Sequence, residues 1–162
     1  MIEKIVGSRY KITKKLGEGG FGATYLAEDL HTFRTSCVVK HLAPKDSRPQ
    51  VFRLAQNLFE REARCLHRLG ENDQIPRLYA HFVEDGQFYL VQEYIEGNDL
   101  SDEIIVGKPL TEEQTIKLLY EILSALTILH QRNIIHRDLK PQNIRRNKQS
   151  GKIVLIDFGA IK

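Results

Sequence analysis

The segment IIHRDLKPQN, from Ile134 to Asn143, holds the side chains with the clearest capacity for chemistry. Asp138 is a carboxylate that could orient a hydroxyl group and accept its proton. Lys140 is a cation two residues further on, where it could meet a transferring phosphoryl group. Asn143 offers a neutral oxygen ligand suited to Mg²⁺, and Asp157, fourteen residues later, offers a second. These residue types suit metal-assisted phosphoryl transfer, although each one alone also has an ordinary structural explanation.

A glycine-rich stretch, GEGGFGATY, contains Gly17, Gly19 and Gly22. The spacing alone is a weak signal, because it also occurs in dinucleotide-binding folds and by chance. A β-type stretch follows it, whereas a dinucleotide fingerprint opens a helix, and the Gly-Lys-Ser/Thr ending of a Walker loop is missing. Two interpretations remain: a hairpin tip whose backbone N–H groups cover phosphates, and a merely flexible turn.

Lys40 and Glu62 could form an ion pair. Lys40 ends the apolar strand CVVK, and Glu62 lies on a side of the following helix that could face the sheet. A lone lysine at a strand end is usually solvated, and a lone helical glutamate is usually a surface residue. Together they permit a pair in which Glu62 holds Lys40 against two phosphates of a nucleotide.

The elements that must position these residues fall into a β-rich part and an α-rich part. Turn residues separate β-favouring stretches between residues 10 and 41, which predicts three consecutive antiparallel strands. Apolar residues at spacings of three and four predict an amphipathic helix over residues 50–69. Two more apolar runs flank Glu84-Asp85-Gly86, a hairpin signal that completes a five-stranded sheet.

After Gly97 the pattern becomes helical. Thr111 and Gln114 form a capping-box pair, and an apolar face follows over residues 111–131. We therefore expect a β-rich part at residues 1–95 and an α-rich part at residues 96–162.

Length, composition and charge limit the class of protein. A chain of 162 residues can form one domain or two small lobes, and 28% charged with 41% hydrophobic residues is typical of globular proteins. The net charge of +3 is spread out, which argues weakly against a nucleic-acid surface. The sequence has no apolar run long enough to span a membrane and no signal core, so a cytoplasmic location is expected. The two cysteines are expected to be buried and reduced.

These motifs give the chain a family resemblance. His136-Arg137-Asp138 with Asn143, then Asp157-Phe158-Gly159, follow the glycine-rich loop and Lys40 in the order and spacing of a protein kinase catalytic domain. The chain is most similar to bacterial serine/threonine kinases. The resemblance implies an α+β, protein-kinase-like fold: a five-stranded antiparallel sheet with one long helix in the N-lobe, and an incomplete helical C-lobe.

The resemblance also implies the residues that bind nucleotide. Those expected to cover or contact the phosphates of ATP are Gly17, Gly19, Gly22 and Lys40, with Glu62 positioning Lys40. Those expected around the adenine base, with Gln92 as the gatekeeper, are Thr24, Val38, Gln92, Glu93 and Ile95. Asp99 stands where a polar residue reaches the ribose.

The catalytic roles follow from the same resemblance. Asp138 would be the catalytic base, Lys140 would steady the γ-phosphate, and Asn143 and Asp157 would hold magnesium. Lys140 matches kinases that act on serine and threonine rather than on tyrosine.

Three positions around the implied adenine pocket depart from the family pattern. Thr24 stands where a valine is usual, and Val38 replaces the usual alanine. Arg145 occupies the place of an apolar residue on the pocket floor, unless a one-residue shift brings Ile144 there. The arginine could lay its aliphatic stem under the base while its guanidinium reaches water.

The sequence ends three residues after Gly159, so the activation segment and the rest of a helical lobe do not follow. We expect the sequence to be a fragment of a longer kinase domain. The apolar face over residues 111–131 would then be exposed, and we expect the chain to form a homo-oligomer through this face.

The leading hypothesis is a fragment of an ATP- and Mg-dependent serine/threonine protein kinase, weakly active or inactive alone. The alternative is a catalytically impaired, kinase-like module that binds nucleotide or regulates a partner. A nucleic-acid binder using Arg145, Arg146 and Lys148 is disfavoured, because RRNKQSGK reads more simply as a solvated hairpin turn.

Overall fold

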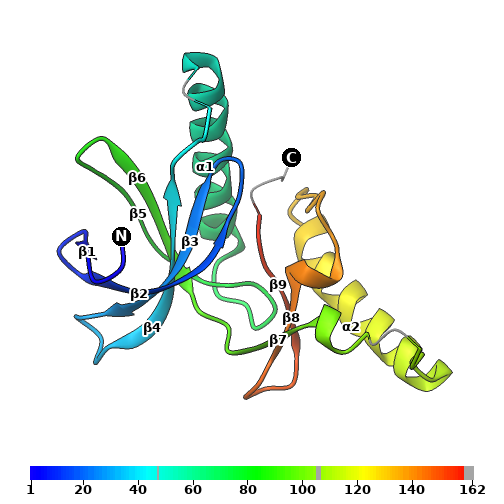
Figure 1. The fold of residues 1–162 in the computed structure, drawn as a ribbon. Helices are drawn as coiled ribbons and strands as arrows, with labels where there is room; N and C mark the ends of the chain where they lie inside the picture. The colour runs from blue at the N-terminus through cyan, green and yellow to red at the C-terminus, as the bar shows by residue number, and fades with distance from the viewer. Residues whose placement is uncertain (47, 105–106, 159–162) are drawn as a thin grey trace. The chain divides into compact units, whose positions relative to one another are not determined.

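The computed structural model describes residues 1–46, 48–104 and 107–158. The chain forms two compact units (Figure 1). The first consists of Met1–Arg64 and Arg77–Tyr94, and the second of Cys65–Pro76 and Ile95–Lys162. The sequence placed the division at residue 95, and that boundary stays a prediction.

The first unit is built on one antiparallel sheet, which Figure 1 shows as a curved surface. Its strands are β1 (Ile5–Val6), β2 (Tyr10–Glu18), β3 (Gly22–Asp29), β4 (Thr35–Leu42), β5 (Leu78–Glu84) and β6 (Gln87–Glu93). They lie in the order β1-β2-β3-β4-β6-β5. The five predicted strands are present, and the two-residue β1 adds a short edge strand that pairs with β2.

Alternation along the strands sorts the sheet residues onto two faces. One face carries a buried apolar cluster: Val6, Tyr10, Ile12, Tyr25, Ala27, Cys37, Val39, Tyr89 and Val91. On the opposite face, aromatic contacts join the sheet to α1 (Pro49–Leu69), with ring centroids 6.1 Å apart for Phe52 and Phe88. Lys40 belongs to this second face, because it alternates with the cluster residue Val39.

Local sequence explains the limits of α1. Pro49 is the first helical residue, where its missing N–H costs nothing and its fixed φ suits a helix. Gly70 follows the last residue with φ of +66°, and its N–H donates to Leu66 O at 3.2 Å. A glycine in the left-handed region is the usual way to end a helix. The structure thus confirms the helix predicted over residues 50–69.

The second unit combines a small sheet with one long helix. The antiparallel strands β7 (Gly97–Asp99), β8 (Ile144–Asn147) and β9 (Ile153–Leu155) lie in that order. The single-turn 3-10 helix η1 (Leu100–Asp102) directly follows β7, and a second one, η2 (Pro141–Asn143), directly precedes β8. Helix α2 (Glu112–His130) begins with the predicted capping box, in which Thr111 N donates to Gln114 Oε1 at 2.9 Å and Gln114 N to Thr111 Oγ1 at 3.2 Å.

Helix α2 buries only a small part of its apolar surface in the described residues. Ala125 and Leu129 are buried, whereas four apolar side chains on the helix are 47–71% exposed: Ile116, Leu119, Tyr120 and Leu123. Association of two copies through this face stays a prediction. In the described parts of the chain, no helix has the length and apolar character of a membrane span.

Candidate active site

The loop before Asn143 is anchored by His136, which is 2% exposed. His136 Nε2 lies 3.0 Å from Ile156 O. Because a carbonyl oxygen only accepts, Nε2 carries the proton, which leaves Nδ1 to accept from Asp138 N at 3.4 Å. The ring also packs on Phe158, with 5.0 Å between centroids. The loop is therefore fixed to the segment that follows β9.

Asp138 lies at the centre of a local network. Its Oδ2 accepts hydrogen bonds from Lys140 Nζ at 2.7 Å and from Asn143 Nδ2 at 2.8 Å. Asn143 Nδ2 donates also to Asp138 O at 2.8 Å, which holds the ends of the loop together. The turn is possible because Arg137 adopts a left-handed φ of +66°. Strained backbone of this kind is concentrated at functional sites in proteins.

Charge keeps Asp138 ionised. The hydrogen bond from Lys140 lowers the pKa of Asp138 below its ordinary value, and the bond from Asn143 acts in the same direction. Burial and the negative charge of Asp157 oppose this effect. The same contact raises the pKa of Lys140. The network is thus a carboxylate and a cation that are both charged at neutral pH.

Asp157 follows β9, is exposed and has φ of +65°. The hydrogen bond from Ile156 N to Asn143 O, 2.9 Å long, ties the segment before Asp157 to the end of the loop that carries Asp138 and Asn143. The side-chain nitrogen of Asn143 donates to two oxygens of Asp138, so the amide oxygen of Asn143 is the atom left for another ligand. An amide oxygen and a carboxylate fit Mg²⁺, which completes its shell with waters and phosphate oxygens. Gly159, the last residue of the motif, lies outside the described residues.

In the first unit, the predicted ion pair between Lys40 and Glu62 is present. Lys40 Nζ lies 2.5 Å from Glu62 Oε1, and the two side chains are only 14% and 4% exposed. Lys40 stands on β4 between Thr24 of β3 and Leu90 of β6, so its backbone is held on both sides. The place of Lys40 in a central strand and the carboxylate of Glu62 on α1 therefore fix the position of the Lys40 ammonium group.

The three predicted glycines, at the end of β2, in the following loop and at the start of β3, differ in what surrounds them. A Cβ at Gly22 would lie 2.1 Å from His41 O, so β4 requires glycine there. In the part of the chain that the structure describes, a Cβ at Gly17 or Gly19 would meet nothing within 4 Å, and neither residue has a positive φ. The packing of the protein therefore explains Gly22 and leaves the other two glycines unexplained.

The remaining predicted nucleotide residues are divided between the units. Val38 of β4 pairs with Gln92 of β6, and both are buried. Gln92 Oε1 is buried without a hydrogen-bond partner in the described part of the chain. Glu93 is held by Arg77, whose N–H lies 3.1 Å from Glu93 Oε2. Ile95 is buried in the second unit.

Asp99 lies in the second unit beside a cation that the sequence assigned elsewhere. Arg145 pairs with Asp99 across β7 and β8, and Arg145 Nη1 lies 3.5 Å from Asp99 Oδ1. Arg145 Nη2 donates to Gly97 O. Ile144, the other candidate for the pocket floor, is 3% exposed. The guanidinium therefore contacts protein groups, whereas the sequence suggested that it reaches water.

The other cations of the β8–β9 hairpin also have acidic partners. Arg146 Nε lies 2.6 Å from Glu103 Oε1, and its Nη1 lies 3.1 Å from Glu121 Oε2. Lys148 Nζ lies 3.0 Å from Glu96 Oε1. These contacts neutralise the basic run within the unit, which weakens the case for a nucleic-acid surface.

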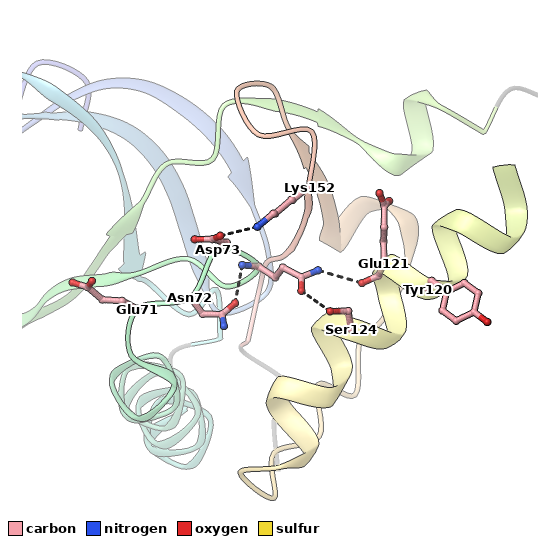
Figure 2. A pocket seen from close by; sticks show the side chains of 8 residues that line it. Glu71, Asn72, Asp73, Tyr120, Glu121, Ser124 and Lys152 are labelled. Carbon is pink, nitrogen blue, oxygen red and sulfur yellow. Dashed lines mark hydrogen bonds and ion pairs between the residues drawn. The ribbon is translucent and has the colours of Figure 1, made fainter.

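A pocket of about 640 Å³ lies apart from the predicted site residues, none of which lines it. Figure 2 shows Lys152 pointing toward Asp73, with Glu121 and Ser124 contributed by α2. Lys152 Nζ lies 2.8 Å from Asp73 Oδ2. Gln74 crosses the pocket, donating to Glu121 O at 3.2 Å and accepting from Ser124 Oγ at 3.0 Å. Its polar groups thus bond largely to one another.

Comparison with known proteins agrees with this fold and these motifs. The chain is similar to a solved structure titled "PpkA-294 apo form", with a TM-score of 0.82 and 24% identity. The matched region covers 99% of this chain and 61% of the chain in that structure. The likeness defines a protein-kinase-like fold. The protein kinase domain model matches residues 10–162, and the chain therefore belongs to the protein kinase family. The fold class and the family predicted from the sequence are confirmed.

The chain is also similar to curated bacterial kinases. It is 48% identical to serine/threonine-protein kinase B of Synechocystis sp., over 97% of this chain and 28% of that protein. It is 44% identical to serine/threonine-protein kinase PknA of Nostoc sp., over 99% and 29% respectively. The probable serine/threonine-protein kinase YbdM of Bacillus subtilis is 34% identical, over 98% and 59%. The chain thus spans less than a third of the length of the two cyanobacterial relatives.

Proposed function

We propose that this chain is part of the catalytic domain of a serine/threonine protein kinase, which transfers the γ-phosphoryl group of ATP to a protein hydroxyl. The observation that carries the proposal is the network at Asp138, whose Oδ2 accepts from Lys140 Nζ at 2.7 Å and from Asn143 Nδ2 at 2.8 Å. A carboxylate, a cation and an amide held in one loop are the groups that this reaction needs. The names of the curated relatives support the same activity.

Each residue of the network has a step to perform. Asp138 orients the hydroxyl of a serine or threonine and accepts its proton as the oxygen bonds to the γ-phosphorus. The bond from that phosphorus to the bridging oxygen breaks, and ADP leaves. Lys140 shifts from Asp138 toward the γ-phosphate and offsets its negative charge. The lowered pKa of Asp138 keeps the carboxylate ionised for this role at neutral pH.

Asn143 and Asp157 are the proposed magnesium ligands. The amide nitrogen of Asn143 is used by Asp138, so Asn143 offers the metal its oxygen, and Asp157 offers a carboxylate. Bound magnesium would neutralise charge on the phosphates of ATP.

Lys40 and the glycine-rich stretch of the first unit are proposed to bind the phosphates of the nucleotide. Lys40, held by Glu62, is proposed to contact the α- and β-phosphates. Gly17 and Gly19, whose small size no contact with the described residues explains, leave room for phosphates under the loop, and Gly22 completes the loop. The residues proposed to surround adenine are Thr24, Val38, Gln92, Glu93 and Ile95, and Asp99 is proposed to contact the ribose.

A phosphoryl-transfer assay tests this proposal. The chain is incubated with radiolabelled ATP, Mg²⁺ and a serine- and threonine-containing protein, beside Asp138→Asn as the matched variant. We expect weak labelling of serine or threonine by the chain alone, and a loss of about 10²- to 10⁴-fold in the variant, typical of removing a general base. We place this activity in the cytoplasm, where a protein substrate meets ATP.

Calorimetry with MgATP on the same samples separates the alternatives. Binding without transfer would exclude a chain that is active alone, and would agree with an inactive kinase fragment as well as with a nucleotide-binding or regulatory module. No binding at millimolar MgATP by a folded chain would refute both interpretations. Equal transfer by Asp138→Asn would refute the role of Asp138.

A further inference from the structure

The contact between Arg145 and Asp99 is built into the small sheet of the second unit. The two residues are directly paired across β7 and β8. The guanidinium reaches back along β7, where Nη2 donates to Gly97 O and Nη1 lies 3.5 Å from Asp99 Oδ1. A planar guanidinium bound at two points has a defined orientation, which a flexible ammonium lacks. Arg145 is thus held in place by the backbone of β7.

Asp99 has no other structural task among its described contacts. It stands at the N-cap position of η1, but its side chain makes no capping hydrogen bond. Its Oδ1 is buried and has no hydrogen-bond partner in the described residues, although the cation lies at ion-pair distance. The side chain is nevertheless 34% exposed. Because Oδ1 is buried, a ligand would have to approach this carboxylate through its other oxygen, Oδ2.

Arg145 is mostly buried, with 24% of its side chain exposed. Its Nε is buried and has no hydrogen-bond partner among the described residues. Burying a cation is unfavourable unless an opposite charge compensates it, and Asp99 is the carboxylate at hand. The pair therefore constrains Asp99, because turning Oδ1 away from Arg145 would leave the cation without that compensation.

We propose that Arg145 is a positioning residue for ribose recognition: it holds Oδ1 of Asp99 inward, so that Oδ2 faces outward and accepts hydrogen bonds from the ribose hydroxyls. The inference rests on the proposed function, because it requires the chain to bind a nucleotide near Asp99. It adds a residue, Arg145, whose position in the sequence suggested only a contact with the base. A purely structural pair, by contrast, would link β7 to β8 and leave ribose selectivity unchanged.

Ribose selectivity is measured as the ratio of two dissociation constants, for Mg-2′,3′-dideoxyATP over MgATP. The full chain is compared with Asp99→Ala, Arg145→Leu, Arg145→Lys and the double variant Asp99→Ala/Arg145→Leu. Hydrogen bonds to a charged group predict a ratio of about 10 or more for the unmodified chain and a ratio near 1 for Asp99→Ala. We expect Arg145→Leu to lower the ratio to about 3 or less, and the double variant to match Asp99→Ala.

Arg145→Lys keeps the charge but cannot contact Gly97 O and Asp99 with the same fixed fork, so we expect an intermediate ratio. This variant decides the question if Arg145→Leu fails to fold, which far-UV circular dichroism reports. The inference would be overturned if a folded Arg145→Leu variant, or the Arg145→Lys variant, had the same ratio of dissociation constants as the unmodified chain. The same ratio in Asp99→Ala as in the unmodified chain would also overturn it.

The same data distinguish failure of the inference from failure of the proposed function. If the folded chain binds MgATP but discriminates equally in every variant, the positioning role is refuted and nucleotide binding stands. If the folded chain binds neither nucleotide at millimolar concentration, the proposed function fails and the inference fails with it.

Discussion

The ion pair of Arg9 and Asp29 predicts a specific loss of stability in acid. Arg9 donates from Nε and Nη2 to the two carboxylate oxygens of Asp29, each bond being 2.7 Å long. His31 N donates to the same carboxylate at 3.0 Å, and the Asp29 side chain is only 4% exposed. The pair closes the end of the β2–β3 hairpin opposite the glycine-rich loop, because Asp29 pairs with Tyr10.

The magnitude follows from the pKa of Asp29. The hydrogen bonds from Arg9 lower it from an ordinary 3.8 to about 2. Since each pH unit between the folded and unfolded pKa corresponds to about 1.4 kcal/mol, the carboxylate contributes about 2 kcal/mol at neutral pH. A lowered folded pKa gives stability that is present in full above the ordinary pKa and is lost as the pH falls toward 2. About half of it remains at about pH 3.

Urea unfolding followed by far-UV circular dichroism measures this contribution. At pH 7 we expect Asp29→Asn to lower the free energy of unfolding by about 2 kcal/mol, and at pH 3 by about half as much. Glu28→Gln is the matched control on the same strand. Glu28 pairs with Arg34 at 3.7 Å, and Arg34 is 72% exposed, so this change should cost less than about 1 kcal/mol. The reasoning would be refuted if Asp29→Asn did not lower the free energy of unfolding at pH 7, or if it lowered it equally at both pH values.

Three further predictions concern the candidate site. Lys40→Met should weaken MgATP binding by about tenfold or more in calorimetry, because a charge-assisted contact to phosphate is lost; unchanged affinity would contradict the role of Lys40. Lys140→Met should raise the pKa of Asp138 toward its ordinary value in a carboxyl NMR titration, since the Lys140 hydrogen bond is the largest cause of its lowering; an unchanged or lower pKa would contradict this cause. Gly22→Ala should cost about 1–3 kcal/mol in thermal unfolding, because the new methyl meets backbone at 2.1 Å. Gly17→Ala, whose methyl meets none of the described residues within 4 Å, is its control and should cost clearly less.

Local sequence patterns predicted the elements that depend on local physics. The helix over residues 50–69 was readable because its buried positions recur at helical spacing and Gly70 ends it. The capping box at Thr111 was readable because its two partners are three residues apart. The five main strands followed from alternation and turn residues. These signals lie within a few residues of one another along the chain.

The sheet of β7, β8 and β9 was not predicted, because its information is not local. Its strands have three or four residues, too few for a period of two to be recognised. Gly97 pairs with Asn147, so the partner strands are far apart in the sequence. The prediction of a hairpin turn in RRNKQSGK was close to the observed β8–β9 connection. What was missing was the third strand that gives this hairpin a neighbour.

The chemistry of the site was predictable as residue types but not as contacts. The spacing of Asp138, Lys140 and Asn143 identified the groups of the loop. It did not show that the Asn143 amide nitrogen is used by Asp138, which depends on the left-handed backbone at Arg137. The pair of Lys40 and Glu62 could be anticipated, because a strand end and a helix face limit where each side chain can reach.

Arg145 shows where transfer of roles from a family reaches its limit. From the sequence, the departure at this position concerned only the base, since family members carry an apolar residue there. The structure places the guanidinium beside Asp99 and Gly97, so the substitution changes the surroundings of a second residue whose own identity fits the family pattern. In our proposal, the role of Asp99 therefore depends on Arg145 as well as on its own carboxylate. A matching residue type is sufficient evidence of a role only when the groups that orient it match too.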